Sequence, residues 1–195
     1  VWWLGEQKYD GATDMLSQYL ASPNAAIREE AAWALVKSGD KNAASLIATM
    51  LEGDESDVQV ALECLKSCAG DVAGVVAPHY QNVSAAGQKA IVNLLGQRNS
   101  VIWKDIVYDA LFSEDAALSK AAAEALPNVV ENSDIIKLYT LLESSSPAES
   151  EAYRTAILSA LSNKTDGEKY DLLVARKSIV PASQEYLYWP MVLKV

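Results

Sequence analysis

The stretch that decides the fold is IREEAAWALVKSG at residues 27–39, which is followed about 30 residues later by VQVALECLKSCAG at 58–70. In each stretch the apolar residues recur at spacings of three and four, which places them on one face of a helix. An alanine precedes a leucine by four positions in both, as Ala31 with Leu35 and as Ala61 with Leu65. The repetition predicts a helical unit that occurs several times along the chain.

The same texture returns three more times, as AGQKAIVNLLGQ (86–97), LSKAAAEALPNV (118–129) and SEAYRTAILSALSN (150–163). A second apolar-periodic stretch precedes each copy, and together these pairs predict helical hairpins. We expect one domain over residues 1–195, with five hairpins at about 11–39, 40–70, 71–99, 100–130 and 133–163, and a C-terminal helix and tail at 167–195.

Turn and cap residues fall between the predicted helices. Ser38-Gly39-Asp40 and Ala69-Gly70-Asp71 each combine a glycine suited to a left-handed helix end with an aspartate suited to cap the next helix. Two prolines disturb the pattern. We expect Pro78 to kink the helix around it or to delay its start, and Pro127 to end its helix early.

A single hairpin cannot bury both of its apolar faces, but stacked hairpins can, and small residues let neighbouring helices approach closely. The equivalent positions of the second helices are Ala31, Ala61, Ala90, Ala122 and Ile157. This pattern, in which a small residue precedes a leucine and Gly-Asp closes the unit, resembles the short HEAT-like repeat of bacterial proteins, the type named with phycobilin lyases. Over about residues 11–163 the resemblance implies an all-α, right-handed α-α superhelix, an armadillo/HEAT-like solenoid.

The two ends differ from the middle. Val1-Trp2-Trp3-Leu4 and the final YLYWPMVLKV are aromatic and apolar, and Gly5–Asp10 echoes Gly167–Asp171. The terminal faces of a solenoid need either a cover or a polar surface. We therefore expect both ends to pack as caps or to continue into neighbouring domains of a longer chain.

Composition and charge narrow the partners. Half of the residues are hydrophobic and 22% are charged, as in a folded soluble chain, and the formal net charge is −10. That charge disfavours nucleic acid and anionic membrane surfaces, both of which attract cations. No apolar run is long enough to cross a membrane, and no signal peptide pattern is visible, which leaves the compartment open.

Few residues suit metal binding or catalysis. Cys64 and Cys68 could form a disulfide or half a metal site, but buried thiols on a helix are the simpler interpretation. His79 is the single histidine and has no acid or nucleophile beside it in sequence. The acidic stretch 52–57 lacks the spacing of a calcium loop and fits an exposed turn. We therefore predict no metal and no cofactor.

The resemblance also carries functional expectations. HEAT-like hydroxylases hold iron with His-Glu pairs, of which this chain has none, and HEAT-like DNA glycosylases use a basic face, which the acidic charge contradicts. We expect a non-enzymatic scaffold that binds a protein or peptide on the concave face of the solenoid. The alternatives are an accessory domain of a larger enzyme and an enzyme with an unrecognised carboxylate site. The candidate binding residues are Arg28, Glu29, Trp33, Gln59, Glu63, Gln88, Asn93, Lys120, Glu124 and Arg154.

The predicted contact between the second helices can be tested by enlarging one of its alanines. Ala61→Leu or Ala122→Leu should overpack this contact and lower the free energy of unfolding by roughly 1–3 kcal/mol. Urea or thermal denaturation measures the change. If both variants unfold like the parent, the inner face has been assigned wrongly.

Overall fold

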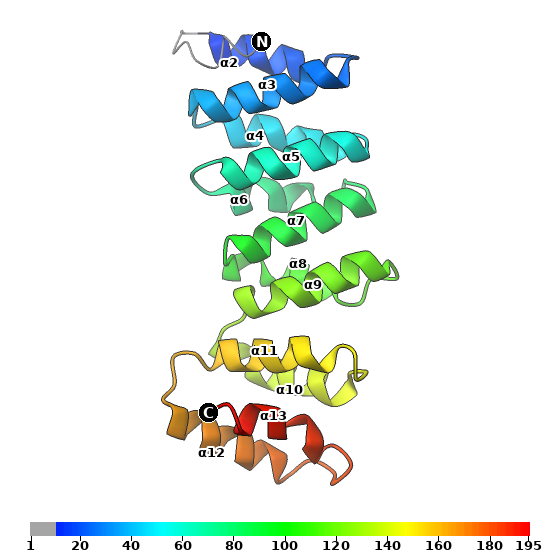
Figure 1. The fold of residues 1–195 in the computed structure, drawn as a ribbon. Helices are drawn as coiled ribbons and strands as arrows, with labels where there is room; N and C mark the ends of the chain where they lie inside the picture. Colours follow the sequence, from blue (N-terminus) through cyan, green and yellow to red (C-terminus); the bar gives the residue numbers. More distant parts are fainter. Residues whose placement is uncertain (1–10) are drawn as a thin grey trace.

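The computed structural model describes residues 11–195, and within that range the regular structure is entirely helical. Five pairs of helices follow one another and stack into a column (Figure 1). The pairs are α2 (Ala12–Leu20) with α3 (Ala25–Ser38); α4 (Ala43–Ala48) and the 3-10 helix η1 (Thr49–Glu52) with α5 (Glu55–Ser67); α6 (Val72–Val76) and η2 (Ala77–His79) with α7 (Ala85–Gln97); η3 (Val101–Trp103) and α8 (Lys104–Ala110) with α9 (Ala116–Val129); and η4 (Asn132–Asp134) and α10 (Ile135–Ser144) with α11 (Ser150–Ala160).

A sixth unit closes the column at its C-terminal end. It consists of α12 (Asp166–Lys177), η5 (Glu185–Leu187) and α13 (Trp189–Val192). The aromatic tail is only partly packed, since Tyr188 is fully buried but Trp189 is half exposed. The predicted cap at Val1–Leu4 and the echo at Gly5–Asp10 lie outside the described residues.

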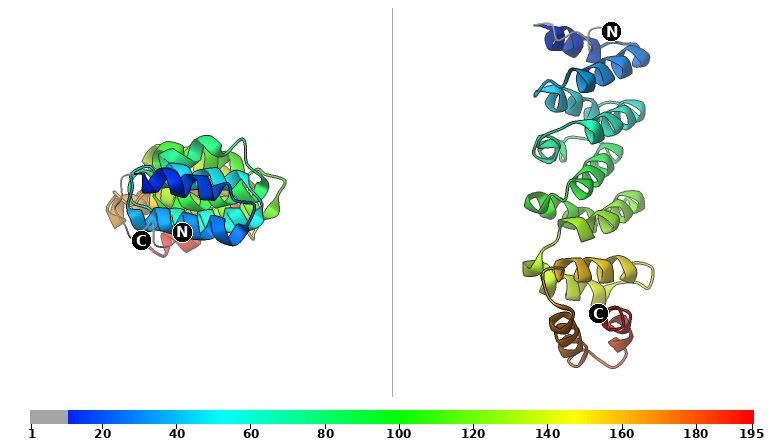
Figure 2. Two further views of the ribbon diagram at one scale, coloured as in Figure 1. Left: turned by 90° about the horizontal axis from the view of Figure 1, so that it is seen from above. Right: turned by 60° about the vertical axis from the view of Figure 1, so that its left-hand side comes forward.

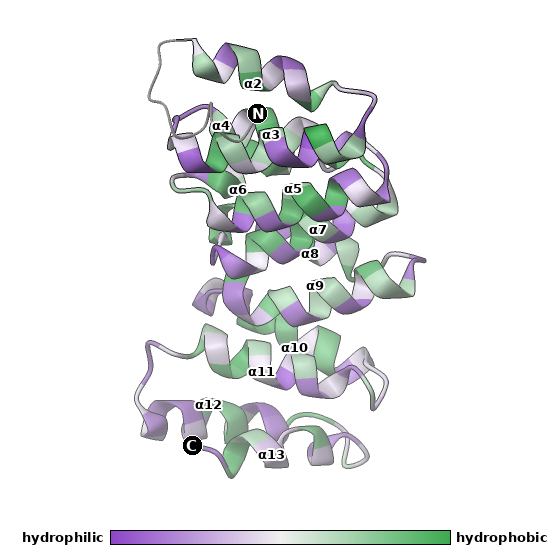
Figure 3. Ribbon diagram, turned by 45° about the horizontal axis from the view of Figure 1, so that its top comes forward, coloured by the Kyte–Doolittle hydropathy of each residue, from purple (hydrophilic) through white to green (hydrophobic). Residues whose placement is uncertain are grey.

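The helices form two layers, and we call α3, α5, α7, α9 and α11 the inner layer and their partners the outer layer (Figure 2). Each inner helix packs against the next inner helix along the column. The longer helices carry both hydrophobic and hydrophilic residues, as expected for helices that bury one face (Figure 3). The predicted fold class, an all-α solenoid of about five hairpins with a C-terminal cap, is confirmed.

The small residues lie where the inner helices meet. The five equivalent positions, occupied by four alanines and one isoleucine, are all buried: Ala31, Ala61, Ala90, Ala122 and Ile157. Helices α7 and α9 approach each other closely, since a Cβ atom added to Gly96 would lie 2.7 Å from the Cβ of Ala125. The inner helices therefore approach to a distance that leaves no room for a larger side chain.

Local chemistry starts and stops the helices as the turn residues predict. Gly39 and Gly70 adopt left-handed conformations with φ of 65° and 84°. The carboxylates of Asp54 and Asp71 accept hydrogen bonds from backbone N–H groups at the starts of α5 and α6. These caps satisfy donors that have no partner inside the helix, and so each hairpin is delimited by its own sequence.

The structure contradicts one of the two proline predictions. The α-helical part of the third outer helix begins at Val72 as predicted and changes to a 3-10 helix around Pro78, so the proline shortens the helix and does not delay its start. The prediction that Pro127 ends the fourth inner helix was wrong, because α9 continues to Val129. Pro127 lies in the last turn, and its carbonyl accepts a hydrogen bond from the hydroxyl of Ser159 on α11.

Two glycine substitutions test the close approach of α7 and α9. Gly96→Ala improves helix propensity but places a methyl group against Ala125, so we expect a loss of about 1–3 kcal/mol in the free energy of unfolding. Gly167→Ala in α12 is the matched control, because its Cβ would meet open space. The control should be neutral or stabilising by up to about 1 kcal/mol in urea denaturation. Equal stability of the two variants would contradict the packing described.

Candidate functional site

The outward face of the inner layer carries a shallow groove that crosses four helices. It consists of three adjoining depressions of about 110, 310 and 640 Å³, between α5 and α7, α7 and α9, and α9 and α11. The first two share Lys89 and Asn93, and the last two share Lys120 and Glu124. We call this surface the inner-layer groove. Its continuity follows from the repeat, which places equivalent residues of successive inner helices side by side.

Small side chains account for the depressions. Alanines recur along the groove because the positions that face it lie next to those that let the inner helices approach. The alanines that line the three depressions are Ala86, Ala90, Ala116, Ala117, Ala121, Ala123, Ala148 and Ala152. Charged and amide side chains stand between them. A shallow surface of this kind can hold an extended or helical segment but does not enclose a small molecule.

Four of the ten candidate binding residues line this groove. Gln59 lies at the α5 end, Asn93 is shared between the first two depressions, and Lys120 and Glu124 lie on α9. Lys120 and Glu124 approach to 3.9 Å, and both side chains are largely exposed, so the pair contributes little to stability and its charges stay available to a partner.

Three other candidates are engaged within the protein. The Arg28 side chain is largely buried, and its Nε donates to Oδ1 of Asp57 at 2.8 Å, which joins the first pair of helices to the second. Gln88 donates to the backbone carbonyl of Tyr80 at 3.2 Å. Arg154 pairs with Glu151 at 2.9 Å. These contacts leave the three side chains fewer groups to offer a partner than the sequence suggests.

The remaining candidates lie toward the N-terminal end of the inner layer. Trp33 on α3 keeps 40% of its surface exposed, and Glu29 one turn earlier is also exposed. Glu63 on α5 is exposed and pairs with Lys66 at 2.7 Å. None of these three lines the inner-layer groove, although all lie on helices of the same layer.

Sequence reasoning missed other lining residues, notably Lys89 and Tyr153. Lys89 lies one helical turn before Asn93, which was a candidate, so helical spacing alone could have identified it. Tyr153 lines the third depression although most of its side chain is buried.

The two cysteines and the histidine considered for catalysis are buried or contact other residues of the protein. Cys64 and Cys68 are both free thiols and buried, which confirms the simpler interpretation, and burial raises the pKa of Cys64 to about 12. His79 Nδ1 lies 2.9 Å from a carboxylate oxygen of Glu52. Within the described residues, no group of three or more His, Cys, Asp or Glu side chains is arranged to hold a metal ion.

Comparison with known proteins agrees with this architecture. A family model for HEAT repeats matches residues 1–66. The crystal structure of an engineered protein is similar, with a TM-score of 0.52 and 18% sequence identity over 78% of this chain and 80% of that chain. Residues 1–66 thus resemble HEAT repeats, and residues 11–195 form an α-helical solenoid. No curated protein matches its sequence, and the engineered structure supports the fold alone.

The similarity of residues 1–66 to HEAT repeats fits a role that depends on an exposed surface. HEAT repeats generally form helical scaffolds for protein interaction, because each repeat adds a strip of exposed surface to a common core. Among the helices of residues 11–195, none combines the length and the apolar character needed to cross a bilayer.

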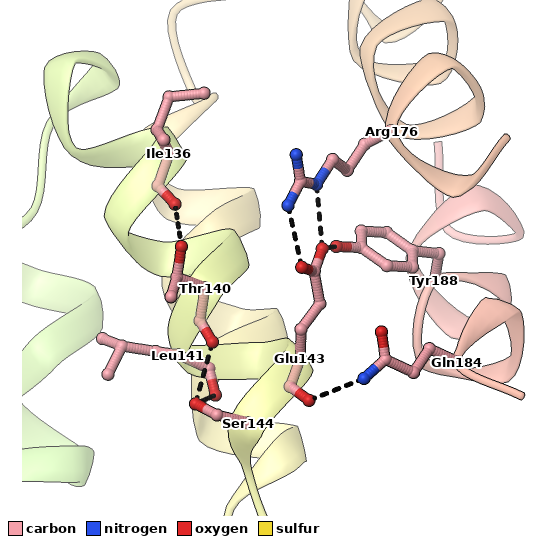
Figure 4. Close-up of polar contacts among 8 residues, drawn as sticks. All are labelled: Ile136, Thr140, Leu141, Glu143, Ser144, Arg176, Gln184 and Tyr188. Atoms are coloured by element: carbon pink, nitrogen blue, oxygen red, sulfur yellow. Dashed lines mark hydrogen bonds and ion pairs between the residues drawn. The ribbon is translucent and has the colours of Figure 1, made fainter. Parts of the chain in front are cut away.

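A polar network fixes the C-terminal unit of the HEAT-like column (Figure 4). The guanidinium of Arg176 on α12 donates two hydrogen bonds of 2.8 Å to the carboxylate of Glu143 on α10. The buried Tyr188 donates its hydroxyl to the same carboxylate, and Gln184 donates to the backbone carbonyl of Glu143 at 3.0 Å. The carboxylate of Glu143 therefore joins α12 and the tail to the fifth pair, and its backbone carbonyl holds the turn between them.

The electrostatics of Glu143 follow from this geometry. Burial alone would raise its pKa, but the hydrogen bonds from Arg176 and Tyr188 outweigh burial, and the pKa is lowered from its ordinary value. The ionised form of Glu143 is thus favoured by folding. Its contribution is complete above the ordinary glutamate pKa of about 4.3 and is lost as the pH falls through the lowered value.

Replacement of this carboxylate tests the network. Glu143→Gln should reduce the hydrogen-exchange protection of α12 and α13 near neutral pH by about 1–3 kcal/mol, because Arg176 loses its charged partner. The difference from the parent should shrink as the pH falls below about 4. Glu63→Gln is the control, since its pair with Lys66 is exposed and should have no measurable effect. A pH-independent difference would contradict the role of the ionised carboxylate.

Proposed function

We propose that this protein is a non-enzymatic scaffold that binds a protein or peptide along the inner-layer groove. The observation that carries the proposal is the continuity of the groove across α5, α7, α9 and α11, through depressions that share their lining residues. An elongated shallow surface suits an elongated partner, whose side chains can enter successive depressions at the spacing of the repeat.

The rigidity of the column supports the same role. Buried side chains from all six units belong to one continuous hydrophobic core, so we treat the five predicted hairpins and the C-terminal helix and tail as one domain. A groove on such a core is held in shape before the partner arrives, which reduces the entropy lost on binding. The charged residues that stand in the groove supply specificity, and its small apolar residues supply contact area.

The chemistry of the groove also favours binding over catalysis. Its lining residues include Lys89, Lys120 and Glu124, and all three side chains are exposed to solvent. Catalytic acids and bases are usually desolvated and have shifted pKa values. A carboxylate-based active site in this groove would need a more enclosed environment than the depressions provide.

Three arginines placed in the groove test the proposal. The triple variant Gln59→Arg, Asn93→Arg and Glu124→Arg fills the three depressions with bulk and positive charge, so a partner bound there should be lost. The matched control is Ser45→Arg, Asp105→Arg and Thr140→Arg, which makes the same change in formal charge at exposed positions of the outer helices α4, α8 and α10. Quantitative affinity capture with the full chain compares the parent and the two variants.

The expected result is that a partner captured by the parent is retained by the outer-layer variant and lost by the groove variant. Circular dichroism melting of the two variants checks that both stay folded. A partner that the groove variant retains would contradict the assignment of the groove, and capture of no partner by the parent would contradict the scaffold itself.

A further inference from the structure

The outer layer carries a second depression, separate from the inner-layer groove, between α10 and the C-terminal helix α12. Its volume is about 520 Å³. In the side view of Figure 2, α12 is turned away from the direction of the fifth pair. The space between the two helices is lined mainly by aliphatic side chains, and three of them are notably exposed: Ile136 by 65%, Leu172 by 42% and Ile179 by 70%. We call this depression the C-terminal groove.

Exposure of this kind is unusual unless a partner covers it. Single exposed aliphatic residues are normal on protein surfaces, but several that converge on one depression mark an interaction site. Ile136 comes from α10, whereas Leu172 and Ile179 come from α12 and the residues just after it. The exposed aliphatic surface is therefore formed by two packed units and does not come from a single residue of one helix.

The charge of the groove differs from that of the whole protein. The chain has 26 acidic residues and a net charge of −10, yet none of the residues that line this groove is a carboxylate. Its only charged lining residues are Lys164 and Arg176. Arg176 is held by Glu143, while Lys164 forms no ion pair with any residue in 11–195, although its charge helps to lower the pKa of Glu168. An apolar groove whose charged lining residues are both cations complements an apolar surface flanked by carboxylates.

The shape of the groove favours a helix of a partner over a small molecule. A small-molecule site buries most of its ligand, whereas three side chains that line this groove keep 42% to 70% of their surface exposed to solvent. An amphipathic helix needs only an apolar trough for its i, i+3 and i+4 side chains. The Glu143–Arg176–Tyr188 network fixes α12 against α10, so the trough exists before the partner arrives (Figure 4).

We propose that the C-terminal groove is a second docking surface, which binds an amphipathic helix of a partner protein whose apolar stripe is flanked by acidic residues. The aliphatic side chains Ile136, Leu172 and Ile179 bury the stripe, and Lys164 pairs with a flanking carboxylate. Because this site lies on the outer layer, the partner can be bound while the inner-layer groove is occupied.

Two labelled synthetic peptides serve as probes. Both are helical with leucines on one face, and the flanking residues are glutamates in one and lysines in the other. We expect the full chain to bind the glutamate peptide at least about tenfold more tightly than the lysine peptide in fluorescence anisotropy. The comparison is stringent, because a protein of net charge −10 attracts the lysine peptide at any non-specific site.

Variants locate the binding. Ile136→Glu should weaken the binding of the glutamate peptide by at least about tenfold, because it places a carboxylate in the C-terminal groove. Phe112→Glu is the matched control, since Phe112 is 72% exposed and does not line this groove, and it should bind like the parent. Both positions are on the surface, so both variants should keep the parent's melting temperature. Lys164→Glu should reduce the ratio between the affinities for the glutamate peptide and the lysine peptide. Lys41→Glu, which lies outside this groove, should leave that ratio unchanged.

Four results would overturn the proposal. These are no binding of the glutamate peptide, equal or tighter binding of the lysine peptide, unchanged binding by Ile136→Glu, and a concentration-dependent dimer of the parent that Ile136→Glu abolishes. The last result would show that the groove is covered by a second copy of this chain. None of the four depends on the inner-layer groove, so failure here leaves the proposed scaffold function standing.

Discussion

The close approach of neighbouring inner helices is the contact on which the rest of the structure depends. At Gly96 and Ala125 the backbones of α7 and α9 come so near that even a methyl group on Gly96 would collide. Ala31, Ala61 and Ala122 occupy equivalent buried positions elsewhere in the inner layer. Small residues bury little apolar area themselves, but they bring the larger leucines of adjacent units into contact, and those leucines supply most of the hydrophobic free energy. The stacking direction, the two layers and the groove between successive inner helices all follow from this spacing.

Side chains that reach from one unit to the next reinforce the stack. Arg28 of the first pair binds Asp57 of the second, and Arg98 at the end of α7 donates to the carbonyls of Leu65, Lys66 and Cys68 at the end of α5. Such a cap matches the negative end of the α5 dipole with a cation. The Glu143–Arg176 ion pair likewise joins the fifth pair of helices to the C-terminal unit. Each bridge joins consecutive units only, so the stability of the column is a sum of nearest-neighbour contacts.

The two grooves arise from this arrangement in different ways. The inner-layer groove exists because the repeat is regular, which aligns small residues of α5, α7, α9 and α11. The C-terminal groove exists because the repeat ends: α12 is turned away from the direction of the fifth pair and leaves Ile136 and Ile179 without a covering helix. The regular part of the array thus offers a long, polar, alanine-lined surface, whereas its irregular end offers a compact apolar one.

The sequence by itself determined the elements and their repetition. Helical periodicity, glycines such as Gly39 and Gly70, and caps such as Asp54 act within a few residues, so the hairpins, the buried alanines and the fold class could be predicted. Only the tertiary structure decided which side chains stay available. Arg28 is engaged by Asp57, α9 continues past Pro127, and Ile136 and Ile179 from different units line one depression. These outcomes depend on residues about 30 or more positions apart, and the packing of separate units, which no local pattern encodes, sets their distances.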